Sequence, residues 1–551
     1  MHMNRSSCVA YFSMEIAFAT HMPNYAGGLG VLAADVIMSA ADRGMNVVGV
    51  SLLYHQNDIR EYGFLGERYL TKLPQTVSVE IEGRKVKLAI WQKDIIGRGG
   101  ATVPIYFLSS HDPENARWDR DLTKHLYAID RYTRLGQEII LGIGGVRALE
   151  ALGYNKVSTY HLNEGHAALA TFELLRRNQY DEARVRSLVT FTTHTPIAAG
   201  HDYFDYGLAG NVLREMMPLN IRELAGNDSL GMTQLALRLS KSVNSVSERH
   251  QSVCQDMFPG AQIRNVTNGI YAPRWAGEHM IELFNAHLPG WDENPIVFLE
   301  SPNRIPPQEL HDAKLLEKNE LTSWVNFNKS YFSVTNVSPE DFLKNETLTI
   351  GFGRRFVPYK RPDLVFRDLE RLARLGSKKM QFIFANRCHP DDYYCNDLRS
   401  KLNEYADKLR GKIKIVLIPD YDLKIAKKLV SGCDIWLNTP VPPMEASGTS
   451  GMKAALNGAL NISTRDGLWI EGLAREPKSG WGFGGAGSYP NQDAQDGVEG
   501  QELMSALEEA VTCYYERRDE WVERSLHALA LLGFFNTTRV VEQYAQDIWE
   551  I

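Results

Sequence analysis

The stretch Met444-Glu-Ala-Ser-Gly-Thr-Ser-Gly-Met-Lys453 is the part of this chain around which the rest is organised. Its small residues include serine and threonine, which cap helix N-termini, and an apolar helix start follows Lys453. Backbone N–H groups at such a start favour an anion, and glycine lets that anion come close. Three interpretations of Lys453 stay open: a solvated lysine on a capped helix, a point charge beside a phosphate, or a Schiff-base lysine for a carbonyl cofactor.

A second anion-binding pattern occurs earlier in the chain. The sequence Arg354-Arg355-Phe-Val-Pro-Tyr-Lys360-Arg361 has four cations in eight residues, directly after a predicted strand at 348–354. A cation cluster is most often a solvated face, but the apolar strand before it and the proline within it favour an anion site. Two phosphate-type sites in one domain suit a reaction that holds two phosphates together.

Alternating strands and helices surround both patterns. The second half predicts strands at 381–385, 413–418 and 434–437, with helices at 363–375, 397–409 and 425–430. The first half predicts strands at 8–14, 46–54, 157–162 and 187–193, with hairpins in an insertion at 59–125. This alternation indicates two consecutive parallel α/β domains, with ligand loops at the carboxyl ends of the strands and a cleft between the domains.

A glycine turn, Gly27-Gly-Leu-Gly30, opens the first predicted helix. Gly28, Gly30 and Ala33 formally match a dinucleotide fingerprint. The glycines follow a long loop, however, and no acidic residue ends the next strand to hold a ribose. A phosphate-binding or sugar-binding loop is therefore the better interpretation.

Composition excludes several classes of partner. The 551 residues carry a net charge of −7 without a long basic run, which argues against nucleic acid and anionic membranes. No apolar stretch is long enough to span a membrane, and no signal peptide precedes the first strand. Six scattered cysteines without a C-x-x-C pair indicate reduced thiols in a cytoplasmic protein, and no metal site is expected.

Together these motifs resemble the α-glucan phosphorylases, in their short prokaryotic form. The matching stretches, which run along nearly the whole chain, are residues 11–15, 25–30, 161–166, 191–201, 267–269, 354–361, His389-Pro390 and 445–453. The last of these is specific to the family, and the others agree with it in order and spacing.

The resemblance implies a GT-B fold, which consists of two Rossmann-like domains with the active site in the interdomain cleft. A glucan-binding domain is expected at 1–270, and a domain that binds pyridoxal 5′-phosphate at 271–551, with its core at 346–475. The C-terminal helix, about 511–551, is expected to pack back on the first domain.

The resemblance also assigns the cofactor site. Lys453 stands at the position of the lysine that holds pyridoxal 5′-phosphate. Thr449, Ser450 and Arg354 match positions around the cofactor phosphate, and the backbone of Gly28 matches a group close to both phosphates.

The remaining matches concern the substrates, which are an α-1,4-glucan with inorganic phosphate, or glucose 1-phosphate in the reverse direction. Arg355 and Lys360 match the cations that hold the substrate phosphate, and with Lys453 they form the expected catalytic set. The expected sugar contacts are Glu445, Ser447, Gly448 and Tyr359, together with His166 and Asn268 in the pocket for the 6-hydroxyl.

The implied reaction is phosphorolysis of the terminal glucose to α-D-glucose 1-phosphate with retained configuration. A nucleotide-sugar glycosyltransferase of the GT-B fold and a non-catalytic glucan-binding regulator are the alternatives. Val357 and Val441 depart from the family pattern near the site, which leaves glucan preference open. Allosteric regulation is not expected, since the regulatory extension of the animal enzymes has no counterpart before Cys8, and a homo-oligomer is compatible with the resemblance.

Overall fold

The computed structural model describes residues 8–22, 24–55, 68–328, 334–336, 342–387, 392–485 and 487–551. The chain divides into two compact units. The first comprises residues up to Ser247, Gln251–Thr267 and Val540–Ile551, and the second comprises Glu248–His250 and Asn268–Arg539. Each unit is built on a largely parallel sheet with helices, so the predicted α/β class is confirmed.

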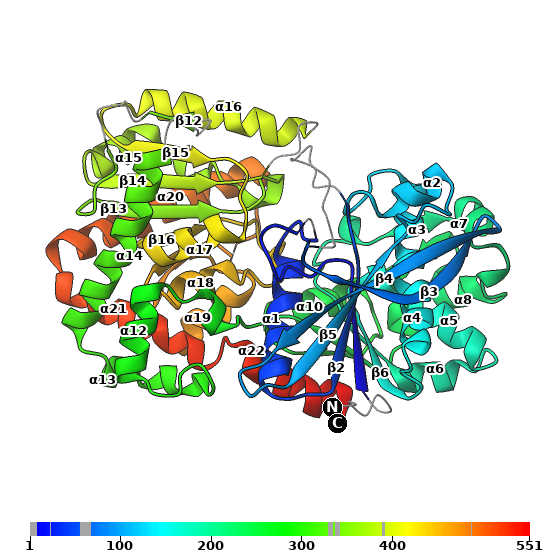
Figure 1. Cartoon of the computed structure of the whole chain (residues 1–551). Helices are drawn as coiled ribbons and strands as arrows, with labels where there is room; N and C mark the ends of the chain where they lie inside the picture. The colour runs from blue at the N-terminus through cyan, green and yellow to red at the C-terminus, as the bar shows by residue number, and fades with distance from the viewer. Residues whose placement is uncertain are drawn as a thin grey trace. The chain divides into compact units, whose positions relative to one another are not determined.

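The strands of the first unit follow apolar, β-branched segments of the sequence. Its main sheet contains β1 (Cys8–Ser13), β2 (Val47–Leu52), β3 (Thr71–Ile81), β4 (Arg84–Ile96), β5 (Thr102–Ser109), β6 (Val157–Asn163), β7 (Val189–Thr192), β10 (Ser242–Ser245) and β11 (Ile263–Asn265). Their order is β11-β10-β7-β6-β1-β2-β5-β4-β3, and Figure 1 labels β2 to β6 of this sheet. The antiparallel pairs are β3 with β4 and β4 with β5, so the hairpin insertion extends the otherwise parallel sheet at one edge. A separate ribbon pairs β8 (Tyr203–Asp205) with β9 (Ser229–Gly231).

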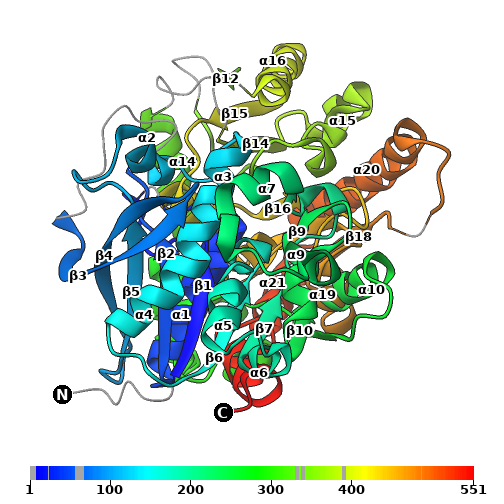
Figure 2. The ribbon, with the colours of Figure 1, turned by 90° about the vertical axis from the view of Figure 1, so that its right-hand side faces the viewer.

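Strand β1 shows why both faces of this sheet are apolar. Side chains alternate between the faces of a strand. Phe12 belongs to a core that includes residues of α3 and α5, whereas Tyr11 belongs to a second core that includes residues of α1. Figure 2 shows α3, α4 and α5 beside this sheet.

The helices of the first unit connect its strands. They are α1 (Gly28–Asp42), α2 (Arg117–Arg120), α3 (Arg131–Ile139), α4 (Gly145–Ala151), α5 (Ala170–Arg177), α6 (Glu182–Leu188), α7 (Tyr206–Leu213), α8 (Ile221–Ala225), α9 (Met232–Arg238) and most of α10 (Glu248–Met257). The end of the chain also belongs to this unit. Tyr544 and Trp549 belong to the hydrophobic core that includes residues of α1, and Trp549 Nε1 donates to His161 Nδ1 at 2.8 Å.

The second unit repeats the architecture on a smaller sheet. Its strands are β12 (Val334–Thr335), β13 (Leu348–Gly353), β14 (Met380–Ala385), β15 (Lys414–Ile418), β16 (Ile435–Asn438), β17 (Leu460–Thr464) and β18 (Gly480–Phe483). They lie in the order β12-β15-β14-β13-β16-β17-β18, and only β12 is antiparallel. Strands β13 and β16 are therefore neighbours, although 81 residues separate Gly353 from Ile435.

Helices surround this second sheet (Figure 1). They are α11 (Ala272–Trp275), α12 (Glu278–His287), α13 (Ser301–Arg304), α14 (Pro307–Asn328), α15 (Leu369–Gly376), α16 (Tyr393–Lys408), α17 (Leu423–Gly432), α18 (Ser450–Ala455), α19 (Leu468–Arg475), α20 (Gln492–Glu516), α21 (Arg518–Ala530) and the start of α22 (Thr537–Gln543).

Two helix predictions are wrong in extent. The helix expected at 363–375 is a short 3₁₀ turn followed by α15, because the Asp368 side chain caps α15 by accepting from the backbone N–H of Arg371. The single C-terminal helix expected at about 511–551 is a series of helices from α20 onward, since Arg517 ends α20 before α21 begins.

Cysteine chemistry also departs from expectation at one position. Cys8, Cys254, Cys433 and Cys513 are free and buried, but Cys395 is disulfide-bonded. Oxidation depends on a second thiol that folding brings near, which scattered spacing does not reveal. Within the described ranges, no helix is long and apolar enough to cross a membrane, and no group of His, Cys, Asp or Glu is arranged to hold a metal ion.

Candidate active site

The cationic loop after β13 and the glycine-rich loop before α18 meet at one carboxylate. Lys360 Nζ donates to Glu445 Oε2 at 2.5 Å, and Arg354 Nη2 donates to the same oxygen at 3.2 Å. Lys360 and Glu445 are both buried. The two loops follow the carboxyl ends of the neighbouring strands β13 and β16, which explains how residues 85 positions apart come into contact.

Burial and repulsion shape the protonation of this cluster. Burial lowers the pKa of Lys360 to about 7, and the nearby charge of Arg354 adds to this, while Glu445 opposes it. Burial works to raise the pKa of Glu445, but Arg354 and Lys360 outweigh it and the pKa is lowered. Lys360 is thus a cation held near the point of losing its proton.

The four cations of this loop have different surroundings. Arg361 is buried and fully engaged: its guanidinium pairs with Asp496 at 2.8 Å and with Glu499 at 2.5 Å. Arg355 is exposed and forms no ion pair within the part of the chain that the structure describes. Arg361 therefore braces the loop, whereas Arg354, Arg355 and Lys360 are the cations that can meet an anion.

The glycine-rich loop is fixed by its neighbours. Gly448 has a φ of +83°, a left-handed conformation that favours glycine. The carbonyl oxygen of Ser447 accepts from the backbone N–H of Leu468 at 2.8 Å. Ser447 Oγ accepts from Asn268 Nδ2 at 2.9 Å, so Asn268 and the glycine-rich loop share one site.

Asp466 accepts a hydrogen bond that fixes the backbone of Glu445, and sequence reasoning did not identify this residue. Its Oδ2 accepts from the backbone N–H of Glu445 at 2.8 Å. Burial and the charge of Glu445 raise the pKa of Asp466 to about 7, against the hydrogen bond from the Glu445 backbone. No local motif marks this residue, because its partner lies 21 positions away.

Lys453 lies on the short helix α18 with its amine against an aromatic face. Its Nζ is 3.9 Å from the ring centroid of Trp275. Asn457 Nδ2 donates to the carbonyl oxygens of both Trp275 and Lys453, at 3.0 and 2.8 Å, and so ties the two segments together. Trp275 and Asn457 are further residues that sequence reasoning missed, although Trp275 lies only seven positions after Asn268.

Thr449 and Ser450 begin this helix, but neither acts as the expected side-chain cap. Thr449 occupies the N-cap position without a capping hydrogen bond. Ser450 Oγ instead accepts from Trp436 Nε1 at 3.2 Å. Gly451 leaves no room for a side chain, since a Cβ there would lie 2.5 Å from Asn461 Oδ1.

Tyr359 completes the cationic loop. Its ring centroid lies 4.4 Å from Lys360 Nζ, and its carbonyl oxygen accepts from the backbone N–H of Val441 at 2.7 Å. Val441 is buried and Val357 is half-buried, so these two departures from the family pattern belong to the framework of the site.

His166 and Gly28 belong to the first unit. His166 follows β6 and has a buried Nδ1 without a hydrogen-bond partner among the described residues. Burial lowers the pKa of His166 to about 3, helped by Arg134 and opposed by Asp202, so the imidazole is neutral. Its Nε2 lies 3.7 Å from Asp202 Oδ2.

Gly28 is the first residue of α1, where Glu15 organises the glycine turn. Glu15 Oε2 accepts from the backbone N–H groups of Ala26 and Gly27, and Oε1 accepts from Tyr127. A Cβ at Gly30 would approach Glu15 Oε2 to 2.8 Å, whereas one at Gly28 would meet no atom within 4 Å. The predicted motif at His389 and Pro390 lies outside the described residues.

Comparisons with known proteins bear on this arrangement. The family model described as carbohydrate phosphorylase matches residues 361–477. A maltodextrin phosphorylase of Thermococcus litoralis is 31% identical over 98% of this chain and 70% of its own length. A glycogen phosphorylase of Mycobacterium tuberculosis is 33% identical with the same coverage, and one of Aquifex aeolicus is 29% identical over 98% of this chain and 86% of its own.

Proposed function

The chain belongs to the carbohydrate phosphorylase family, a family of hexosyltransferases, and from this premise we propose that it is an α-1,4-glucan phosphorylase. The proposed reaction transfers the terminal glucose of an α-1,4-glucan to inorganic phosphate and gives α-D-glucose 1-phosphate with retained configuration. The proposed architecture is the GT-B fold, with Rossmann-like domains at 1–270 and 271–551 and the reaction in the cleft between them.

The main support for this proposal is that Arg354 and Lys360 both donate to Glu445. A phosphorolytic site needs cations for phosphate directly beside acceptors for sugar hydroxyls. Here Lys360 and the Glu445 carboxylate are buried together, where charge interactions are stronger than in water.

Lys360 and Arg355 hold the substrate phosphate in this proposal. With a pKa of about 7, Lys360 gains its proton readily when a phosphate anion approaches, because the added negative charge favours the ammonium form. The bound phosphate then protonates the glycosidic oxygen and attacks the anomeric carbon from the face that this oxygen leaves. Glycosidic bond cleavage and formation of the new C–O bond on one face retain the configuration.

The sugar is bound by acceptors that the protein leaves unsatisfied. Asn268 Oδ1 and His166 Nδ1 are buried and have no hydrogen-bond partner in the described ranges, which supports their assignment to the 6-hydroxyl pocket. Glu445, Ser447 and the backbone of Gly448 supply further contacts to the glucosyl hydroxyls, and Tyr359 adds one beside Lys360.

The residues around Lys453 fit pyridoxal 5′-phosphate, which when bound supplies a phosphate close to the substrate phosphate. Arg354 Nη1 is buried without a hydrogen-bond partner among the described residues, and it is a donor suited to a phosphate oxygen. Trp275 offers a flat apolar surface at the lysine amine. Lys453, Thr449, Ser450, Arg354 and the backbone of Gly28 are the residues proposed to hold the cofactor.

Two measurements test this function. Purified protein given maltoheptaose and phosphate should form glucose 1-phosphate, and maltoheptaose given a nucleotide sugar in place of phosphate should not be lengthened. Borohydride reduction and peptide mapping should find a pyridoxyl group on Lys453. Transfer from a nucleotide sugar, or an adduct on another lysine in active protein, would contradict the proposal.

A further inference from the structure

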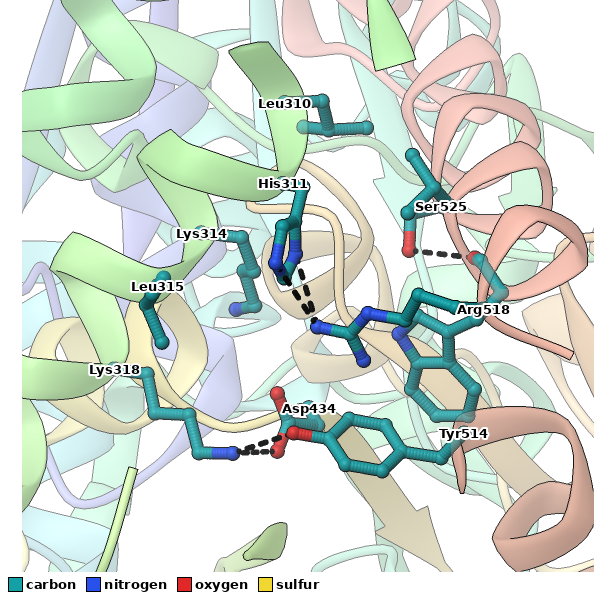
Figure 3. Close-up of a pocket in the computed structure, with 11 residues that line it drawn as sticks. Leu310, His311, Lys314, Leu315, Lys318, Asp434, Tyr514, Arg518 and Ser525 are labelled. Carbon is teal, nitrogen blue, oxygen red and sulfur yellow. Dashed lines mark hydrogen bonds and ion pairs between the residues drawn. The ribbon is translucent and has the colours of Figure 1, made fainter. Parts of the chain in front are cut away.

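A cavity of about 370 Å³, part of it open to solvent, lies among α14, α20 and α21 in the second unit (Figure 3). Of this, about 20 Å³ accommodates the centres of water-sized groups, which is room for a small ion but not for a larger ligand. The cavity adjoins Asp434, which precedes β16, and so lies at the amino end of the strand whose carboxyl end leads to the Glu445 loop.

The base of the cavity is a complete buried ion pair. Lys318 Nζ donates to Asp434 Oδ2 at 2.6 Å and to the Tyr514 hydroxyl at 3.0 Å. The same Asp434 oxygen accepts from the backbone N–H of Thr349 at 2.8 Å. Asp434 therefore neutralises Lys318 and is held by the sheet.

Two other cations line the cavity without such a partner. Lys314 is buried and donates to the carbonyl oxygen of Ser431, and Arg518 Nη2 donates to His311 Nδ1 at 2.9 Å. Figure 3 shows Arg518 reaching from α21 toward His311 on α14. Within the part of the chain that the structure describes, neither Lys314 nor Arg518 forms an ion pair with a carboxylate. Burial and the charge of Arg518 lower the pKa of His311, so the imidazole is a neutral acceptor.

Nearby carboxylates do not remove this excess of two positive charges. Glu317 Oε1 accepts from the backbone N–H of His279 at 2.9 Å, and exposed Asp312 accepts from Gln308 at 2.8 Å. Neither residue lines the cavity. Burial lowers the pKa of Lys314 even though Asp434 and Glu317 oppose it. Lys314 is buried and Arg518 is half-buried, so their uncompensated charge carries a desolvation cost that a bound anion relieves.

We propose that this cavity binds a small tetrahedral dianion, with inorganic phosphate as its simplest form. Two negative charges match the excess from Lys314 and Arg518, and a guanidinium fork is suited to two oxygens of such an ion. The small cavity favours an ion of this size over a nucleotide. This site is separate from the phosphate position at Arg355 and Lys360, and the inference does not rest on the proposed reaction.

The test uses neighbouring leucines on α14. Leu315 lines the cavity and is 41% exposed, whereas Leu316 does not line it and is 48% exposed. Leu315→Glu adds a negative charge at the site, and Leu316→Glu adds the same charge outside it. Calorimetric titration of the full chain with phosphate, at constant ionic strength and in a Lys360→Met background, should give weaker binding by about tenfold or more for Leu315→Glu. Leu316→Glu should bind like the parent.

Arg518→Gln should weaken phosphate binding by a similar factor. If the Arg518→Gln variant does not fold, the comparison of Leu315→Glu with Leu316→Glu tests the proposal by itself. Sulfate should compete with phosphate, whereas chloride should not. Tighter binding of glycerol phosphate would identify a phosphate ester as the source of the same dianion. Equal binding by Leu315→Glu and Leu316→Glu, or no binding by the parent, would overturn the proposal.

Discussion

Two buried lysine–carboxylate pairs lie at opposite ends of strands β13 and β16. Lys360 and Glu445 meet at 2.5 Å beyond the carboxyl ends, and Lys318 and Asp434 meet at 2.6 Å by the amino ends. Their geometry is alike, but their surroundings differ. The comparison therefore separates what an ion pair does for a fold from what it does for a ligand.

The difference lies in how completely the neighbouring groups are hydrogen-bonded. Asp434 is bound to the backbone of β13, and Lys318 has a second acceptor in Tyr514. Beside Glu445, Arg354 Nη1 is buried with no partner in the described ranges, and Lys360 is held with a pKa near 7. A pair whose own groups are satisfied stabilises a structure, and the anion proposed near Lys318 is assigned to Lys314 and Arg518. Beside Glu445 the unsatisfied donor adjoins the pair itself, which suits that pair to bind a ligand.

The largest expected effect is on stability at the satisfied pair. Lys318→Met should lower the free energy of unfolding by about 3–5 kcal/mol, because it leaves Asp434 charged and buried without its ammonium partner. Lys360→Met should cost well under half of this, since Arg354 still pairs with Glu445. Urea unfolding of both variants measures the difference, and equal losses would show that the two pairs serve the fold alike.

The next effect is on the reaction. Lys360→Met should reduce phosphorolysis by about 10²–10³-fold, the usual cost of removing one charge-stabilising donor, with a much smaller change in glucan affinity. Initial rates at varied phosphate and separate glucan-binding measurements distinguish the two quantities. Lys408→Met, at an exposed position on α16, is the matched control and should keep full activity. Parallel loss of rate and glucan affinity would instead assign Lys360 a structural role.

The smallest expected effect is on the pH dependence of stability, through Asp466 beside Glu445. The pKa of Asp466 is raised to about 7 in the folded chain, above the ordinary value of about 3.9. Its contribution to stability is thus fully present below about pH 3.9 and is lost as the pH rises to 7. Asp466→Asn keeps an acceptor for the Glu445 N–H and should make the unfolding free energy less dependent on pH between 4 and 7, by up to about 1.4 kcal/mol per unit. An unchanged slope in urea unfolding from pH 4 to 7 would contradict this assignment.

Particular residues show how far sequence reasoning reached. The cationic loop and the glycine-rich loop can both be identified in the sequence as anion-binding patterns, since their residue types are adjacent in the chain. The sequence does not distinguish Arg361 from its neighbours, but the structure pairs it with Asp496 and Glu499 on α20. Local composition cannot distinguish a cation that is available to bind a ligand from one that a carboxylate already neutralises.

The sequence alone determined the α/β class, most of the strands and the family, because these depend on side-chain periodicity and on motifs of adjacent residues. Tertiary structure alone decided that Lys360 and Arg354 meet at Glu445, that Asp466 supports this carboxylate, and that Trp275 lies against Lys453. These contacts join residues from 21 to 178 positions apart. The order of strands in a sheet and the packing of helices on it bring such residues together, and neither leaves a periodic trace in the chain.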